Sequence, residues 1–135
     1  MADSQAAVPA ACGLIGTWRF VELVDWDSTG QASYAFGPHP AGYLIYTETG
    51  QVSVHLAGTS PPSLSSAAAA GIPQASYFGT FETDSACGTV IHHVEGGTDP
   101  GEIGTSQARP FHLVADTLIL GDGHTWRRTL VRVTR

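Results

Sequence analysis

Residues 14–26, LIGTWRFVELVDW, are the stretch that decides the fold. From position 17 to position 26 aromatic and β-branched residues alternate with polar ones, which is the pattern of a β-strand. The even-numbered positions share one face, which carries Trp18, Phe20, Glu22, Val24 and Trp26. The odd-numbered positions carry Arg19, Val21 and Leu23 on the other face. The two tryptophans favour the even-numbered face as the interior of the protein.

The same pattern continues to the end of the chain. Further strands are predicted over residues 32–36, 42–47, 51–56, 75–83, 88–95, 105–114, 117–120 and 124–134. Turn residues such as Asp27-Ser28-Thr29-Gly30 and Glu48-Thr49-Gly50 separate them. About eight to nine short strands of this spacing are typical of an all-β barrel or sandwich, and no stretch has the helical period of a βαβ fold. We therefore predict a single all-β domain.

Two segments do not fit the strand pattern. Residues 1–13 are rich in Ala, Ser and Pro and are predicted to form a flexible arm, so the domain is expected to span residues 14–135. Residues 57–73 form the one long irregular loop, and their alanine run favours about two helical turns. A loop of that length in a small barrel predicts a short lid or portal segment.

The opening strand resembles that of the lipocalins, in which a Gly-x-Trp sequence, here Gly16 to Trp18, closes one end of an up-and-down barrel. In that architecture an arginine of the last strand packs over the tryptophan, and the resemblance implies Arg127 or Arg128 in this role. The chain also resembles the bacterial and fungal family called the lipocalin-like domain. Four blocks carry this resemblance in order: LIGTWRF (14–20), FGPHPAGYLIYT (36–47), YFGTFE (77–82) and GTVIHHVEG (88–96), with GTSQARPF (104–111) as a fifth. It covers residues 14–130 and implies a lipocalin-like barrel.

Composition excludes several classes of partner. The 135 residues contain six arginines, no lysine and twelve acidic residues, for a formal charge of −6. This balance argues against nucleic acid and against an anionic membrane surface. No P-loop, dinucleotide fingerprint or Gly-x-Ser-x-Gly elbow is present, so no cofactor and no serine-triad hydrolase is expected.

The two cysteines, Cys12 and Cys87, are too few for a disulfide framework. A single bridge between them stays open, although two reduced thiols in a cytoplasmic protein is the preferred interpretation. The N-terminal stretch lacks a basic region followed by an apolar one, so no signal peptide is expected. We predict a cytoplasmic protein.

His92, His93 and Glu22 are the candidate catalytic residues. Adjacent residues of a strand point to opposite faces, so only one of the two histidines faces inward. His93 shares a face with Glu95, which would orient its imidazole; the alternative is a polar ladder on the surface. His92 lies between valines and is either the inward residue of a site or a core histidine bonded to another polar side chain. Glu22, if inward, would have a raised pKa suited to acid–base chemistry; otherwise it lies in solvent.

The candidate ligand-binding residues are mostly aromatic side chains that suit a cavity wall. They are Trp18, Phe20, Trp26, Tyr43, Tyr46, His55, Tyr77, Phe81, Arg109 and Trp126. Arg109 suits a carboxylate, enolate or phenolate of a ligand, or else an ion pair with Glu95, Glu102 or another carboxylate at the rim. A metal site built from His55, one of the paired histidines and a glutamate lacks any spacing signature, so no metal is expected.

Three functions are compatible with these features. The first is binding of a small, largely apolar molecule, polyketide-, terpenoid- or fatty-acid-like, because an eight-stranded barrel holds one small ligand. The second is a cofactor-independent isomerase or cyclase in natural-product biosynthesis, which requires acid–base groups inside the barrel. The third is a protein-interaction module with a filled interior. A homodimer through exposed strands is also possible.

Overall fold

The computed structural model describes residues 10–59 and 73–134, and the chain forms one antiparallel sheet that closes on itself. Its strands are β1 (Gly16–Trp26), β2 (Ala32–Ser33), β3 (Ala41–Tyr46), β4 (Gln51–Ala57), β5 (Gln74–Thr83), β6 (Thr89–Gly97), β7 (Ser106–Val114), β8 (Thr117–Leu120) and β9 (Trp126–Arg132). Two short helical elements, α2 (Ala10–Gly13) and η1 (Pro100–Glu102), lie outside the sheet. The expectation for a lid over residues 57–73 falls mainly on residues outside the described part.

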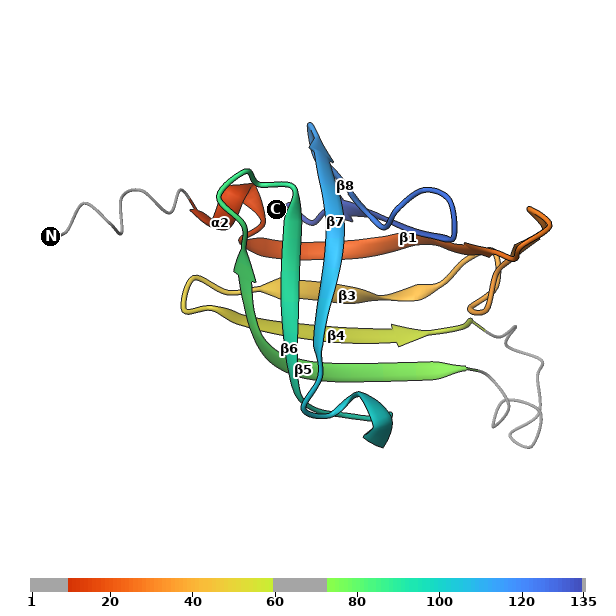
Figure 1. Cartoon of the computed structure of the whole chain (residues 1–135), viewed down its shortest axis with the longest axis horizontal. Coiled ribbons are helices and arrows are strands. Elements are labelled where there is room, and N and C mark those ends of the chain that lie inside the picture. Colours follow the sequence, from red (N-terminus) through yellow and green to blue (C-terminus); the bar gives the residue numbers. More distant parts are fainter. Residues whose placement is uncertain (1–9, 60–72, 135) are drawn as a thin grey trace, which may run out of the picture.

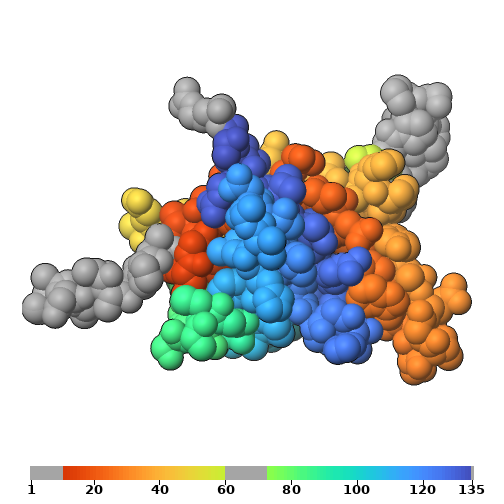
Figure 2. Space-filling model, turned by 90° about the horizontal axis from the view of Figure 1, so that it is seen from above, coloured from red at the N-terminus to blue at the C-terminus, as the bar shows by residue number. Residues whose placement is uncertain are grey.

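β1 pairs with β3, each strand from β3 onward pairs with the next along the chain, and β9 pairs back with β1, which closes a barrel of eight strands. The two-residue strand β2 adds to the end of β1 through Asp25 and Trp26. In Figure 1, β1, β3, β4 and β5 run across the view while β6 and β7 pass steeply in front of them. Seen from above, the C-terminal strands fill the centre of the surface, between the red N-terminal segment and the orange segment that follows β1 (Figure 2). The predicted all-β lipocalin-like barrel is confirmed.

The barrel interior follows the two-residue period of the strands. Successive strands turn alternate side chains inward, such as Leu44 and Tyr46 of β3, and these are almost completely buried. The buried apolar core includes Leu14, Trp18, Phe20, Val52, Val54, Val90, Phe111, Leu118 and Leu130. Where strands approach most closely the interior position is glycine: a Cβ on Gly79 would lie 1.9 Å from the carbonyl oxygen of His93. No side chain fits there.

A β-bulge in β1 breaks its alternation. Phe20 pairs with Leu130 and Glu22 pairs with the preceding residue, Thr129, so Val21 is the extra residue. Before the bulge the even-numbered residues face inward, and after it the odd-numbered residue Leu23 does. The expectation that one unbroken face of this strand lines the interior is therefore wrong beyond Phe20.

Trp18 closes one end of the barrel, as the resemblance implied. It is fully buried, and its indole N–H donates to the carbonyl oxygen of Leu14 at 2.9 Å. The arginine that packs over it is Arg132, with its guanidinium carbon 4.2 Å from the ring centroid. Trp18 and Arg132 are opposite each other in the β1–β9 ladder, so the expectation of Arg127 or Arg128 in this place is corrected by the register.

Cys12 and Cys87 form a disulfide, which corrects the expectation of two reduced thiols. The bridge ties α2 to the turn between β5 and β6, and it closes a loop with a sequence separation of 75. Residues 10–13 are thus attached to the barrel, whereas the rest of the predicted arm, residues 1–9, lies outside the described residues. Among the described residues, no helix has the length and apolar character needed to cross a bilayer.

The bridge is expected to stabilise the barrel by restricting the unfolded chain. A loop of this length predicts that removing the bridge lowers the free energy of unfolding by about 2–4 kcal/mol. Urea unfolding of the oxidised protein, the protein in dithiothreitol and the Cys12→Ser/Cys87→Ser variant measures the loss. Dithiothreitol should have no effect on the double variant. Equal stability of all three samples would contradict the prediction.

Candidate functional site

A cavity of about 190 Å³ lies inside the barrel. Most of its wall is apolar and is supplied by Phe20, Leu23, Phe36, Leu44, Val54, Leu56, Ala75 and Leu120. Its polar wall is formed by Tyr77, His92, Glu102, Arg109 and Arg128. Trp126, an apolar ring with one N–H group, also lines the cavity. A cavity of about 150 Å³ accommodates benzene, so this one has room for a molecule of about one ring with a small substituent. The cavity is half open, so a longer molecule would extend out of it into solvent.

His92 is the centre of the polar wall. It projects inward from β6 and is 1% exposed. Its Nε2 lies 2.7 Å from the Tyr46 hydroxyl oxygen, and its Nδ1 lies 2.6 Å from the Tyr77 hydroxyl oxygen. Both ring nitrogens are therefore engaged in a hydroxyl–imidazole–hydroxyl chain that joins β3, β6 and β5. This chain explains how a polar ring is tolerated in the core.

Burial sets the protonation of this chain. Burial, with a smaller contribution from the Arg109 charge, lowers the pKa of His92 to about 3, so the imidazole is neutral. Burial also raises the pKa of Tyr46 and of Tyr77 above their ordinary values. All three groups are uncharged at neutral pH, and they act as hydrogen-bonding groups rather than as ions.

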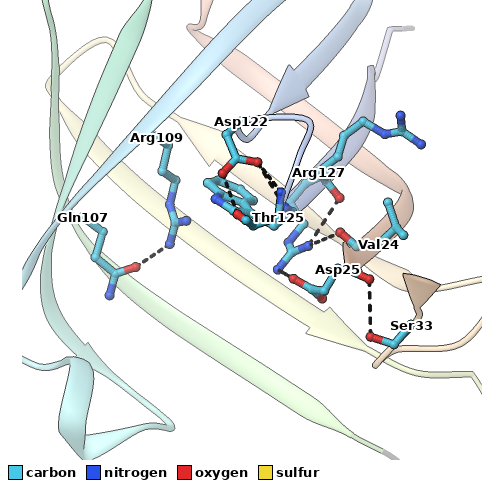
Figure 3. Close-up of polar contacts among 10 residues, drawn as sticks. Val24, Asp25, Ser33, Gln107, Arg109, Asp122, Thr125 and Arg127 are labelled. Atoms are coloured by element: carbon cyan, nitrogen blue, oxygen red, sulfur yellow. Dashed lines mark hydrogen bonds and ion pairs between the residues drawn. The ribbon is translucent and has the colours of Figure 1, made fainter. Parts of the chain in front are cut away.

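Arg109 brings a positive charge to the cavity wall. It projects inward from β7, and its Nη2 donates to Gln107 Oε1 of the same strand (Figure 3). The same Nη2 lies 3.4 Å from the Tyr77 hydroxyl oxygen, and Nε lies 3.4 Å from His92 Nδ1. No carboxylate of the described residues lies within salt-bridge distance of Arg109, although Glu102 also lines the cavity.

Trp126 lies against two guanidinium groups. The guanidinium carbons of Arg109 and Arg128 lie 5.4 Å and 5.1 Å from its ring centroid. Unlike Arg109, Arg128 has a carboxylate partner, because its Nη2 donates to Asp25 at 3.2 Å. Cation–π contacts of this kind hold the indole as a fixed part of the wall.

The turn before β9 fixes the position of Trp126, the first residue of that strand. Asp122 accepts hydrogen bonds from the backbone N–H of Thr125 at 2.6 Å and from the Thr125 hydroxyl (Figure 3). It also accepts one from the backbone N–H of His124 at 2.7 Å. These bonds, that of the Thr125 hydroxyl first, lower the pKa of the Asp122 carboxyl. The sequence marked this segment as a turn without indicating its link to the cavity.

The structure separates the three predicted catalytic residues. His92 faces the cavity. His93 faces outward, where its Nδ1 lies 2.7 Å from Ser106 Oγ and its Nε2 lies 2.6 Å from Glu82 Oε2, so its carboxylate partner is Glu82 and not Glu95. Glu22 also faces outward because of the bulge, and it accepts a hydrogen bond from Arg127 at 2.9 Å. Its expected place as a buried carboxylate is therefore corrected.

The predicted ligand-binding residues fall into three groups. Those in the cavity wall are Phe20, Tyr77, Arg109 and Trp126. Those buried but outside the wall are Trp18, at the closed end, and Tyr46, which bonds His92 and packs 4.6 Å from the partly buried Phe81. Those on the outer surface are Tyr43, His55 and Trp26: Tyr43 is 46% exposed, His55 bonds Ser53, and Trp26 lies under Arg127. For these last three the expected inward orientation is wrong.

Several wall residues were missed in the sequence. Leu44, Val54 and Leu56 follow from the two-residue alternation once one strand face is known to be interior. Leu23 and Arg128 depend on the β1 bulge and on the β9 register, which no local pattern indicates. The metal site considered from sequence does not assemble, because His55 and His93 lie outside and His92 inside. No group of three metal-ligating side chains occurs among residues 10–59 and 73–134.

These features define a class of protein: a closed antiparallel barrel with a small internal cavity, mostly apolar and polar on one wall. The family described as the lipocalin-like domain matches residues 15–129, and the chain belongs to that family. Such a barrel is consistent with small-molecule binding. No curated protein matches the chain. Among solved structures it is similar to a lipoprotein YedD from Klebsiella pneumoniae subsp. pneumoniae, with 16% identity over 94% of this chain and 77% of that one and a TM-score of 0.48.

Neutral, buried His92 makes the barrel sensitive to acid. The unfolded chain takes up a proton as pH falls through the ordinary pKa of 6.5, whereas folded His92 does so only near 3. The contribution of His92 to the free energy of unfolding is therefore fully present above pH 6.5 and lost progressively below it. Between pH 7.5 and pH 5 this contribution falls by about 2 kcal/mol.

Urea unfolding at these two pH values measures this loss in the wild type and in His92→Gln. The variant lacks the titrating group and should lose about 2 kcal/mol less. An NMR titration should show the His92 ring unprotonated down to about pH 4. Equal losses in both proteins would contradict the assignment.

Proposed function

We propose that this barrel binds one small, largely apolar molecule of about one ring in its cavity. The observation that carries the proposal is the half-open cavity of about 190 Å³ with an apolar wall and a polar cluster on one side. Small-molecule sites have this composition: apolar surface supplies the affinity and a few polar groups fix the orientation. The volume favours a monoterpenoid-like or single-ring aromatic molecule over the longer ligands expected from the sequence.

A cofactor-free isomerase or cyclase is the second candidate. The observation that favours it is the chain of Tyr46, His92 and Tyr77, which brings an exchangeable proton to the cavity wall. Two observations weigh against it. Glu22 lies outside the barrel, and the lowered pKa of His92 makes it a weak base at neutral pH. Binding without conversion therefore stands first. An interaction module with a filled interior is disfavoured by the cavity itself.

The disulfide bears on where binding takes place. Disulfides persist in oxidising compartments and are rare in the cytosol. The Cys12–Cys87 bridge therefore supports an oxidising compartment as the site of function, in place of the cytoplasmic location expected from the sequence. Mass spectrometry of the natural protein, with free thiols alkylated at lysis, should find no alkylated cysteine. Alkylation of both would support the cytoplasm.

Filling the cavity should abolish binding. Ala75 lines the cavity wall, so Ala75→Phe places a ring where the ligand would lie. Ala108 is exposed on β7, and Ala108→Phe makes the same substitution outside the barrel. Calorimetric titration with a panel of single-ring terpenoids and aromatics should show one saturable site in the wild type and in Ala108→Phe, and none in Ala75→Phe.

The ligand recovered after titration is then examined by chromatography and mass spectrometry. Intact recovery is expected. An isomer formed by the wild type but not by His92→Gln would replace the binding proposal with the enzymatic one. Binding by Ala75→Phe equal to that of the wild type, with circular dichroism showing that the variant is folded, would place the ligand elsewhere.

A further inference from the structure

We propose that the cavity selects ligands that carry a carboxylate, held by Tyr77 and Arg109 with the apolar body against the opposite wall. This inference rests on the proposed binding function and names the chemistry of the head group. It follows from which group donates and which accepts in each hydrogen bond along the chain of Tyr46, His92 and Tyr77.

The Tyr46 end fixes the direction of the chain. Tyr46 is 1% exposed, and among the described residues its hydroxyl has no hydrogen-bonding partner except His92 Nε2. If Nε2 carried the proton, the Tyr46 O–H would have no acceptor in a place that water does not reach, which is costly. The Tyr46 O–H therefore donates to Nε2, and the proton of the neutral imidazole is on Nδ1.

The direction then passes on to Tyr77. His92 Nδ1–H donates to the Tyr77 hydroxyl oxygen at 2.6 Å. The oxygen also faces Arg109 Nη2 at 3.4 Å, and Arg109 is a donor too. The Tyr77 O–H consequently has no acceptor among the described residues. Because Tyr77 lines the cavity, this hydrogen is available to a ligand.

Arg109 adds donors of the same kind. With the proton on Nδ1, the contact of Arg109 Nε with His92 at 3.4 Å joins two donors and contributes no hydrogen bond. Only Gln107 Oε1 and the long contact with Tyr77 then occupy this guanidinium. The polar cluster of Tyr77 and Arg109 thus offers O–H and N–H groups and a positive charge, and it offers no acceptor.

Such a cluster complements a group that only accepts. A carboxylate accepts from a hydroxyl and a guanidinium at once, and charge-assisted bonds of this type are the stronger ones. An alcohol or an amide brings donor hydrogens for which Tyr77 and Arg109 supply no acceptor, and it lacks the negative charge that Arg109 attracts. Arg128 does not compete for this role, because Asp25 already accepts from it at 3.2 Å.

Within the part of the chain that the structure describes, Glu102 is the one acidic side chain in the cavity wall. It forms no salt bridge within 4.0 Å among the described residues, and after burial, the main cause, its charge also raises the pKa of Tyr77. It therefore weakens the attraction of Arg109 for an anion. Removing its charge should strengthen carboxylate binding, which a purely apolar cavity would not show.

The test compares benzoate with benzamide and nitrobenzene, three single-ring molecules of similar size, by calorimetric titration at pH 7.5. The carboxylate is an acceptor with charge, the nitro group an acceptor without charge, and the amide carries donor hydrogens. We expect benzoate to bind at least tenfold more tightly than benzamide, which corresponds to one charge-assisted hydrogen bond. Nitrobenzene should lie between them.

Variants then locate the head group. Arg109→Gln and Tyr77→Phe should remove most of the preference for benzoate while leaving nitrobenzene binding within about threefold. Glu102→Gln should tighten benzoate binding and leave nitrobenzene unchanged. Arg19→Gln makes the same charge change as Arg109→Gln on the exposed face of β1 and should keep the full preference.

The outcomes separate this inference from the proposed function. Equal affinities for the three molecules, or a preference that persists in Arg109→Gln, would overturn the carboxylate site and leave the binding function standing. No binding of any single-ring molecule would overturn both. An NMR signal from His92 showing the proton on Nε2 would overturn the direction of the chain on which the inference depends.

Discussion

The pairing of β1 with β9 is the interaction on which the rest of the structure depends. It joins the first and last long strands over residues 18–25 of β1, so the sheet has no open edge there and its backbone groups are satisfied within the barrel. The seam also contains the bulge at Val21. Without that extra residue Glu22 would face an apolar interior, where an unpaired carboxylate is costly. The bulge turns it outward to Arg127 and places Leu23 in the cavity instead.

Much of the fold was predictable because each strand carries its own signal. The run predicted over residues 51–56 is β4, and the loop Glu48-Thr49-Gly50 separates it from β3. The valines beside His92 favoured this histidine, and not His93, as the inward residue. These predictions depend on neighbours in the sequence, which is where alternation and turn chemistry operate.

The failures share a different physical origin. The orientation of Glu22 and Trp26 depends on a one-residue insertion in a ladder, and a one-residue shift reverses every side chain that follows. Arg132, rather than Arg127 or Arg128, meets Trp18 because of the register between strands at opposite ends of the chain. The pairing of Cys12 with Cys87 likewise depends on where α2 meets the distant turn between β5 and β6. None of these long-range pairings follows from a local sequence pattern.

The cavity combines a large apolar wall with a polar cluster whose buried members satisfy one another. His92 is hydrogen-bonded at both ring nitrogens, and the two hydroxyls that bond it come from strands on either side of it in the fold. A satisfied network of this kind holds its members in one arrangement, whereas a partly satisfied one would cost stability. Among the described residues, the Tyr77 hydroxyl hydrogen has no acceptor within this network, and Tyr77 lines the cavity.

The disulfide has a mechanical consequence. The covalent loop from Cys12 to Cys87 contains β1 to β5, whereas β6 to β9 lie outside it. If the chain were pulled by its two ends, only the residues outside the loop would extend. The residues inside the loop, a sequence separation of 75, would not extend until the bridge was reduced. Reduction would then lengthen the chain by roughly 250 Å at about 3.3–3.6 Å per residue. In the oxidised protein, the disulfide thus limits the greatest end-to-end extension of the chain.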